Sequence, residues 1–247
     1  DARSLVGVND RAQLAATETV MQARIIEKWR RSGVTIRDGA VIHDTVKIAP
    51  DATIENGVTL RGTTTVSAGA VVDVGCVIED SFLGENTIIR PYTVVSYSRL
   101  EAGAHVGPFA HIGAGTMIGT QSQVGNFVET NKTILHPHAK ANHLAYIGDA
   151  EVGQSATIGA GTIFCNDDGY QKHRTRIGPG AFIGCNSKLV APVDVGKNAY
   201  VATGTTVTQD VPDEALAIGR AQQENKADYA PTLRHQLKTA ARVKHET

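Results

Sequence analysis

Aliphatic side chains recur at about every sixth position through most of the chain, and this spacing is the strongest pattern in the sequence. The phase slips by one residue at a few places and then resumes, so that 28 positions share the pattern. These positions are Ile36, Ile42, Ile48, Ile54, Leu60, Val66, Val72, Ile78, Leu83, Ile89, Val95, Leu100, Val106, Ile112, Ile118, Val124, Leu135, Ala141, Ile147, Val152, Ile158, Phe164, Ile177, Ile183, Leu189, Val195, Val201 and Val207. A glycine often follows the aliphatic residue directly, as at Gly84, Gly159 and Gly184.

A period of six fits neither an α-helix, which repeats near 3.6 residues, nor a half-buried strand, which repeats at 2. It is typical of a hexapeptide β-helix, in which each aliphatic residue fills the interior and small residues permit the corners between faces. With three units in each coil, the pattern predicts about nine coils stacked about 4.8 Å apart, a prism about 45 Å long. The fold class we expect is therefore all-β, a parallel β-helix over residues 34–211.

A different pattern precedes the prism. Residues 9–33 carry apolar side chains on roughly one face, with charges elsewhere, and this arrangement predicts one amphipathic helix about 35 Å long. The apolar residues are Leu14, Met21, Ile25 and Trp29. Asn9 or Asp10 can cap the start of the helix and Gly33 its end. Residues 212–247 form a polar tail, within which Thr232 to Lys244 could form a short basic helix.

Two interruptions of the period are candidate loops. The first is Thr130 to Ile134, and the second, longer one is Cys165 to Arg176, with the sequence CNDDGYQKHRTR. Functional residues are often found on exposed loops that leave a rigid scaffold. The second loop is rich in polar and charged groups, so it is the first candidate for a functional site.

Composition supports this picture and excludes several classes of protein. The chain has 43 valines and isoleucines against 11 leucines, and β-branched residues favour strands. With 24 basic and 25 acidic residues it offers no overall attraction to nucleic acid or to an anionic membrane. No apolar run approaches the ~20 residues that span a bilayer, and the first residues do not resemble a signal peptide. Its three cysteines, Cys76, Cys165 and Cys185, form no CxxC motif and indicate free thiols in a reducing, cytoplasmic setting.

Five histidines concentrate before the second loop, at His105, His111, His136, His138 and His143. Any one of them can be an exposed turn residue. Alternatively, one neutral histidine acts as the general base for an amine or hydroxyl nucleophile. A third possibility is a zinc site of His111, His138 and His143, which would indicate a hydratase resembling the gamma-class carbonic anhydrases.

Three stretches carry a family resemblance: VGNFVETNK, then KANHLAYIGDAEVGQSATIGAGTIFCNDDGYQKH, then KLVAPVDVGKNAYVATGTTVTQDV. They resemble the C-terminal acetyltransferase part of the bifunctional UDP-N-acetylglucosamine pyrophosphorylase/glucosamine-1-phosphate N-acetyltransferases, which belong to the hexapeptide-repeat acyltransferases. The resemblance covers roughly Val6 to Arg220 and is specific because residues outside the repeat take part. Hexapeptide repeats alone would indicate only the fold.

The resemblance implies a left-handed prism, a homotrimer, and acetyl-CoA as cosubstrate in the groove between neighbouring prisms. It implies N-acetylation of glucosamine 1-phosphate, a step toward UDP-N-acetylglucosamine and the peptidoglycan and lipopolysaccharide precursors made from it. The family's general base falls on His143, the acid that orients this base on Glu129, and a stabilising residue of the reacting centre on Asn166.

The resemblance also assigns binding residues. Tyr146 and Lys172 match residues that contact sugar and phosphate, and Lys132 is a candidate replacement for a phosphate-binding lysine. The residues that match coenzyme A contacts or line its groove are Ala160, Gly161, Cys185, Thr203 and Arg220. The implied partners are these two small molecules and further copies of the chain.

Several positions depart from the family. Its phosphate-binding arginine falls on Gly113 and the partner lysine on Asn131. Lys132 is one residue away from the latter, although a one-residue slip usually changes the face on which a side chain projects. The other departures are Thr157 for Asn, Asp167 for Tyr and Cys185 for Ser. These differences leave open an acceptor that is another amino sugar phosphate. A catalytically silent trimerisation module is a further alternative.

The N-terminus matches the end of the family's nucleotidyltransferase domain. Residues 1–8 would be a remnant of that domain, and Asn9 matches its Mg²⁺ ligand. The rest of the domain is missing from the sequence, so we expect a fragment of a bifunctional parent, no metal in the acetyltransferase part, and helix capping as the role of Asn9.

Overall fold

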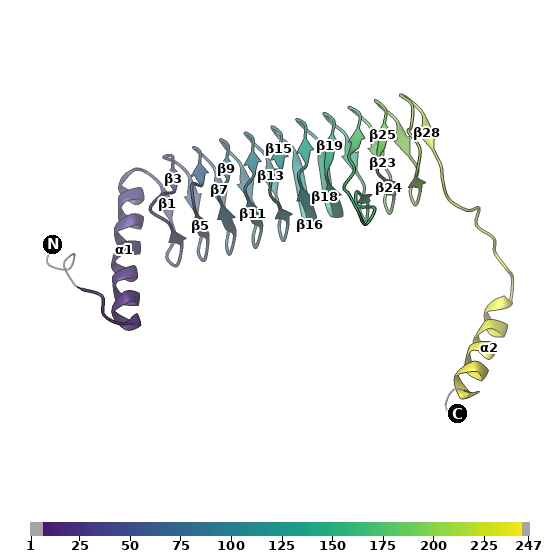
Figure 1. Ribbon diagram of the computed structural model, residues 1–247, viewed down its shortest axis with the longest axis horizontal. Coiled ribbons are helices and arrows are strands. Elements are labelled where there is room, and N and C mark those ends of the chain that lie inside the picture. Colours follow the sequence, from purple (N-terminus) through teal and green to yellow (C-terminus); the bar gives the residue numbers. More distant parts are fainter. Residues whose placement is uncertain (1–6, 244–247) are drawn as a thin grey trace.

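The computed structural model describes residues 7–243, and its central body is a long prism of stacked coils (Figure 1). Helix α1 (Arg11–Arg31) lies across the first coil, and helix α2 (Tyr229–Val243) follows the last coil after an extended segment. All strand pairings in the prism are parallel, and the strands form a 19-stranded sheet and a 9-stranded sheet. The predicted parallel β-helix is confirmed.

The strands lie on three faces of the prism. Face 1 holds β1 (Thr35–Ile36), β4 (Thr53–Ile54), β7 (Val71–Val72), β10 (Ile88–Ile89), β13 (His105–Val106), β20 (Thr157–Ile158), β23 (Phe182–Ile183), β26 (Tyr200–Val201) and β28 (Leu216–Ala217). Face 2 holds β2 (Val41–Ile42), β5 (Thr59–Arg61), β8 (Val77–Glu79), β11 (Val94–Ser96), β14 (His111–Ile112), β21 (Ile163–Cys165), β24 (Lys188–Val190) and β27 (Thr206–Val207). Two longer strands, β16 (Gln123–Asn131) and β18 (Lys140–Gly148), run from face 1 onto face 2. Face 3 holds β3 (Lys47–Ile48), β6 (Thr65–Val66), β9 (Phe82–Leu83), β12 (Arg99–Leu100), β15 (Met117–Ile118), β17 (Ile134–Leu135), β19 (Ala150–Val152), β22 (Thr175–Ile177) and β25 (Val193–Val195).

The residues that the period singles out form the central columns of the interior. All 28 predicted aliphatic positions are buried, and they stack directly above one another, as Ile36 does on Ile54. Each coil therefore buries one large side chain per face, and the stack amounts to about ten coils rather than the nine expected. Every interior residue stacks on the equivalent residues of the adjacent coils. This register determines which outward-facing side chains are neighbours, and therefore which residues can form a site together.

The predicted interruption at Thr130 to Ile134 is wrong. Thr130 pairs with Ile112 in the coil before and with Ile147 in the coil after, and it is completely buried. It therefore occupies an ordinary interior position on face 2, and the polar side chain alone hid it from a pattern of aliphatic residues. The second predicted loop is present and projects from the prism between β21 and β22.

Helix α1 closes the first coil. Asp10 is its N-cap, with the carboxylate accepting from the Gln13 N–H at 2.8 Å, as predicted. Ile25, Ile26 and Trp29 pack against the end of the core, whereas Leu14 and Met21 of the predicted apolar stripe remain exposed.

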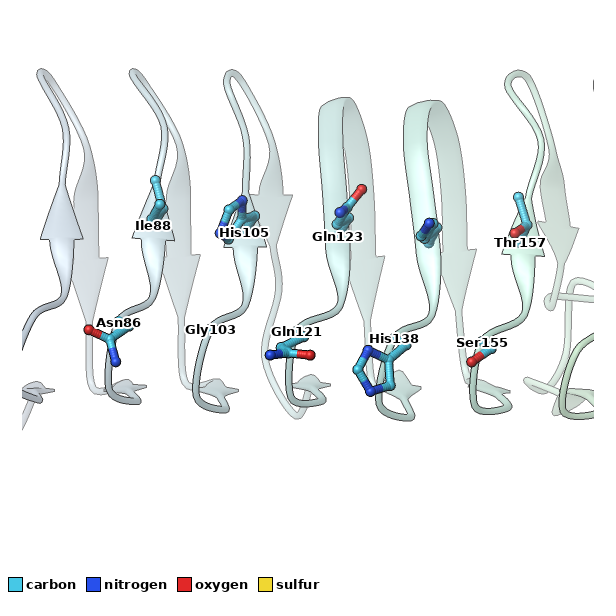
Figure 2. Close-up of a pocket in the computed structure, with 10 residues that line it drawn as sticks. Asn86, Ile88, Gly103, His105, Gln121, Gln123, His138, Ser155 and Thr157 are labelled. Carbon is cyan, nitrogen blue, oxygen red and sulfur yellow. The ribbon is translucent and has the colours of Figure 1, made fainter.

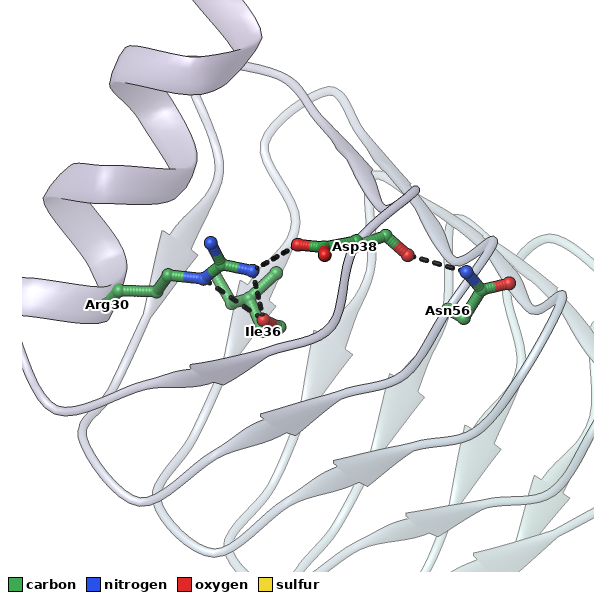
Figure 3. Close-up of polar contacts among 4 residues, drawn as sticks. All are labelled: Arg30, Ile36, Asp38 and Asn56. Carbon is green, nitrogen blue, oxygen red and sulfur yellow. Dashed lines mark hydrogen bonds and ion pairs between the residues drawn. The ribbon is translucent and has the colours of Figure 1, made fainter.

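Side chains of α1 also form hydrogen bonds with the unpaired backbone groups at the open edge of the sheet. The Gln22 amide bonds both the N–H and the carbonyl of Ile42 at 3.0 Å, in place of a neighbouring strand. The Arg30 guanidinium donates to the Ile36 carbonyl and to Asp38, and Asn56 of the next coil bonds the Asp38 carbonyl (Figure 3). The helix thus protects an edge that could otherwise pair with another chain.

The C-terminal end differs slightly from the expectation. The sheet continues past residue 211, because β28 pairs with β26, and α2 begins three residues before the expected Thr232. Residues 1–6 of the expected domain remnant, and Lys244 at the end of the expected helix, lie outside the described residues. Between residues 7 and 243, no helix combines the length and the apolar character needed to cross a membrane.

Candidate functional site

The corner between faces 1 and 2 gathers several predicted site residues. His143, Ala160, Cys185 and Thr203 each lie two residues after the buried residue of their face 1 strand, and those buried residues stack in register. Arg220 reaches the same column from the end of the prism, where its guanidinium donates to the Thr203 carbonyl at 2.8 Å. The residue predicted as general base therefore lies in line with residues predicted to contact coenzyme A.

The character of this corner changes at His143. In the preceding coils the next position holds Tyr92, Phe109 and Phe127, which are exposed and stack with ring centroids 5.4 and 5.7 Å apart. We call these three residues the aromatic stripe. In the following coil the equivalent position is Gly161, where a Cβ would collide with the Asn186 side chain. From Ala160 onward the corner therefore carries small residues in place of the aromatic rings.

The contacts of His143 differ from the expectation. Its Nδ1 lies 2.6 Å from Oδ1 of Asn126, which is its register partner on the neighbouring strand β16. Glu129, the predicted orienting acid, pairs instead with Tyr146 in the register and lies 3.6 Å from His111 Nδ1. Among the contacts of residues 7–243, none joins Glu129 to His143, because the two residues occupy different positions along face 2.

Tyr146 and Asn166 lie close together at the end of face 2 that is nearer to face 3. A Cβ placed on Gly148 would lie 2.6 Å from the Tyr146 hydroxyl and 2.7 Å from Nδ2 of Asn166, so both groups converge over this glycine. Asn166 is 5% exposed and donates to the Asp149 carboxylate at 2.6 Å. An asparagine amide has two hydrogens, so one remains for a further acceptor. Sequence analysis did not identify Asp149.

The projecting loop, residues 166–174, is fastened at both ends. Besides the Asn166–Asp149 bond, Arg174 pairs with Glu151 at 2.9 Å, and Asp167 and Lys172 form an antiparallel bridge within the loop. A hydrogen bond from His136 holds the pKa of Glu151 below its usual value, with Arg174 contributing further.

Inside the loop, His173 lies 2.7 Å from the Asp168 carboxylate. That contact, with backbone N–H groups of Gln171 and Tyr170, lowers the pKa of Asp168 to about 2. The loop is therefore an ordered turn whose shape depends on charged contacts.

A cavity of about 260 Å³ lies where the loop meets the corner between faces 2 and 3. Its lining includes the side chains of three cationic residues, together with one acid and one histidine, namely Lys132, Lys172, Arg174, Asp149 and His173. Lys132 has a positive φ (47°) at this corner, as Gly115 and Asp149 do at the equivalent positions of the neighbouring coils. The predicted substrate residues Lys132 and Lys172 are therefore brought together, and the cluster of cations suits a phosphate.

The positions that differ from the family pattern lie in different parts of the structure. Gly113 has no room for a side chain, because a Cβ would lie 2.7 Å from the Thr130 carbonyl oxygen. Asn131 ends strand β16, next to Lys132 in the sequence, and Asp167 accepts from the Gly169 N–H within the loop. Thr157 lies on face 1, away from the cavity.

Another hollow on the surface lies away from the cavity and the corner. A groove of about 690 Å³ crosses face 1, where Ile88, His105 and Gln123 lie on successive strands above a row of turn residues that includes His138 (Figure 2). None of the residues predicted as catalytic lines it. Its regular polar lining follows from the repeat, so we place the candidate site at the cavity and the corner rather than in this groove.

The zinc alternative gains no support from the geometry. His138 lies at the corner between faces 3 and 1, His111 is beside Glu129 on face 2, and His143 is held by Asn126. No group of three or more histidine, cysteine or acidic side chains suited to a metal occurs between residues 7 and 243. At the N-terminus, the Asn9 N–H donates to the Gln13 side chain, so Asn9 takes part in the start of α1, and this single amide makes no metal site.

The thiols differ in their surroundings. Cys185 is exposed on the face 1–face 2 corner, whereas burial raises the pKa of Cys76 to about 11. Cys76 is therefore an interior packing residue, and of these two thiols only Cys185 is exposed at the candidate site.

The repeat identifies the class of protein. Residues 174–209 match the repeat described as "Bacterial transferase hexapeptide (six repeats)". This match agrees with the parallel β-helix and places a repeat of hexapeptide transferases at residues 174–209.

Comparison with individual proteins narrows the class. The bifunctional protein GlmU of Sorangium cellulosum (strain So ce56) is 57% identical over 242 residues, which are 98% of this chain and 51% of that protein. The GlmU of Geobacillus thermodenitrificans (strain NG80-2) is 44% identical over 117 residues, 47% of this chain and 26% of that protein. The chain is therefore similar over nearly its whole length to the C-terminal part of the GlmU proteins, and it spans about half the length of the Sorangium relative.

Among solved structures, an Arabidopsis UDP-N-acetylglucosamine acyltransferase is 19% identical with a TM-score of 0.39, covering 83% of this chain and 75% of that one. The sequence resemblance to the bifunctional family is confirmed by the GlmU relatives alone.

Proposed function

We propose that the chain transfers acetyl from acetyl-CoA to the amine of glucosamine 1-phosphate, giving N-acetylglucosamine 1-phosphate for UDP-N-acetylglucosamine synthesis. The observation that carries the proposal is the position of His143, which lies between the small residues of the face 1–face 2 corner on one side and the cation-lined cavity across face 2 on the other. The homology to GlmU supports an acetyltransferase role, and we propose a cytoplasmic setting for it.

The chemistry needs a base near neutral pH. The net reaction joins R–NH₃⁺ and the acetyl thioester to give the amide, free coenzyme A thiol and one proton, with a C–N bond formed and a C–S bond broken. His143 would take a proton from the amine nitrogen, the role for which a neutral imidazole is suited. Asn166 has an amide hydrogen free to stabilise developing charge, and Tyr146 beside it would contact the sugar.

The acceptor would lie across face 2. His143 and Tyr146 are three residues apart on strand β18, about 10 Å along an extended strand. The long side chains of Lys132 and Lys172 would reach from the cavity toward His143. A sugar whose phosphate is bound by these lysines would then place its amine near His143. In this chain Lys132, Lys172 and Arg174 would take over the phosphate contacts that the family assigns to positions 113 and 131.

The acetyl-CoA groove would follow the face 1–face 2 corner. Ala160, Gly161, Cys185 and Thr203 leave room for the pantetheine arm, and Arg220 at the end of this column would contact a phosphate of the coenzyme. We propose that the chain assembles as a homotrimer in which a neighbouring prism closes this groove, because one chain supplies only an open corner.

The experiment is an assay of thiol release from acetyl-CoA with glucosamine 1-phosphate, comparing the wild-type chain with His143→Ala. We expect turnover in the wild type and a loss of about 100-fold or more in His143→Ala, the range of a general base. His105→Ala is the matched control, because His105 lies on face 1 in the groove of Figure 2, and it should retain full activity.

Two alternatives have distinct outcomes. Turnover with another amino sugar phosphate but not with glucosamine 1-phosphate would assign a different acceptor, which the substitutions at Gly113, Asn131 and Asp167 motivate. Binding of acetyl-CoA without turnover of any amino sugar would overturn the proposal and favour a silent assembly module.

A further inference from the structure

The side chain that touches the imidazole of His143 is Asn126. Nδ1 of His143 and Oδ1 of Asn126 are 2.6 Å apart, and the two residues are register partners on β16 and β18. A carbonyl oxygen can only accept, so a neutral imidazole in this contact carries its hydrogen on Nδ1 and keeps a lone pair on Nε2. The contact therefore selects the tautomer that a general base needs.

The other side chains near the His143 ring form no hydrogen bond with it among the contacts of the described residues. On β16, Glu129 is half-exposed and lies 3.6 Å from His111. On β18, Lys140 points into the face 1 groove, and the neighbouring strand β20 with its following turn presents uncharged Thr157, Ile158 and Ala160. Asn126 is the one side chain with a hydrogen bond to His143 among the contacts of residues 7–243.

We propose that Asn126 is the positioning residue of His143, holding the Nδ1–H tautomer by a neutral hydrogen bond in the place where the family is expected to use Glu129. This inference rests on the proposed acetyl transfer. A neutral acceptor orients the ring without stabilising its charged form, whereas a carboxylate in the same place would favour the imidazolium, which cannot accept a proton.

The first test is the tautomer itself, measured by long-range ¹H–¹⁵N correlation on the full ¹⁵N-histidine-labelled chain. The chain has nine histidines, so His143→Gln identifies the signals of His143 by difference. We expect the Nδ1–H pattern in the wild type and in Glu129→Gln, and a shift toward the Nε2–H pattern in Asn126→Ala. An Nε2–H pattern in the wild type, or a shift in Glu129→Gln but not in Asn126→Ala, would overturn the inference.

The second test is the pH dependence of acetyl transfer. Residues that orient a histidine through its second nitrogen commonly contribute about 10- to 100-fold, so Asn126→Ala should lower kcat by that amount with KM for acetyl-CoA little changed. Asn126→Asp keeps an acceptor and adds a charge, so it should retain activity while the acid limb of the rate profile moves to higher pH. A purely structural role predicts equal losses in both variants and no movement of the limb, and that result would overturn the inference.

The two proposals can fail separately. A wild-type chain without acetyl transfer on any amino sugar, but with the Nδ1–H tautomer lost in Asn126→Ala, would overturn the proposed function and support the contact. Active transfer with an unchanged tautomer and an unchanged pH profile in both Asn126 variants would overturn the positioning role alone.

Discussion

At the scale of single residues, the register decides which side chains can act together. Sequence analysis identified His143, Tyr146, Lys132 and Lys172, and the structure connects them across one face of the prism. It paired His143 with Glu129, whereas the hydrogen-bonded neighbour in the structure is Asn126, because resemblance assigns roles by position in a motif and does not measure contacts. Asn126 was within the quoted stretch VGNFVETNK, 17 residues before His143, which is the length of that coil, so register arithmetic could have found it.

Lys132 is the residue on which the phosphate site depends most. Its side chain lines the cavity with Lys172 and Arg174, and its stem packs over Gly115, whose Cβ would lie 3.5 Å from it. We expect Lys132→Ala to raise KM for the sugar phosphate about 10- to 100-fold with kcat nearly unchanged, since a charge-assisted contact is worth about 1.5–3 kcal/mol. Steady-state kinetics with varied acceptor measure this.

The matched control for this prediction is Lys140→Ala. Lys140 lies on face 1 and lines the groove of about 690 Å³, so its removal changes the net charge equally without touching the cavity. Equal effects of the two substitutions would show that Lys132 acts only through overall charge, and would contradict a direct phosphate contact.

At the scale of elements, the coils were predictable and the deviations from them were not. Every position that the six-residue period singled out is buried, because the fold requires one buried position per face. Thr130 escaped this pattern because its place in the interior is set by its neighbours Ile112 and Ile147 and not by its own polarity. The loop at 166–174 was recognised by its length, but its shape rests on ion pairs that composition does not reveal.

The loop should respond to acid in a defined window. The pKa of Asp168 is lowered from 3.8 to about 2 by the contact with His173 and by backbone N–H groups. A depressed carboxyl pKa adds stability that is complete above the unfolded value and is lost as the pH falls through the folded value. The loop should therefore remain closed down to about pH 4 and open as the pH approaches 2.

Cleavage by an acid protease at the exposed Tyr170 can follow this opening, with each rate normalised to an unstructured peptide of the same sequence. Asp168→Asn removes the titrating group, so its loop should be cleaved readily across the whole range. A wild-type rate that does not change between pH 4 and pH 2 would contradict the role of Asp168.

At the scale of the whole molecule, the corner between faces 1 and 2 differs from the other two corners because it carries an exposed row of aromatic side chains. The aromatic stripe of Tyr92, Phe109 and Phe127 is exposed and leads directly to His143. Bulky aromatic residues at positive φ are uncommon, and these three have φ between 54° and 57°. The fold does not need large side chains there, since Gly161 and Gly204 serve at equivalent corners with positive φ.

We therefore expect the stripe to lie in the subunit interface of the proposed homotrimer. Phe127→Ser should weaken assembly by about 2 kcal/mol, roughly 30-fold in the dissociation constant, as for an aromatic interface anchor. Sedimentation velocity over a range of concentrations measures this shift. Because the groove beside His143 would lose its second wall, acetyl transfer should fall with dissociation and recover at high protein concentration.

Tyr97→Ser provides the comparison for this experiment. Tyr97 is 58% exposed, close to the 57% of Phe127, but it lies on the corner between faces 2 and 3, away from the stripe. It should leave both assembly and activity unchanged if the corner between faces 1 and 2 is the contact surface. Dissociation in Tyr97→Ser with an intact assembly in Phe127→Ser would instead assign the interface to the other corner. In that case the groove beside His143 would have to function on a single chain, and its activity would be independent of protein concentration.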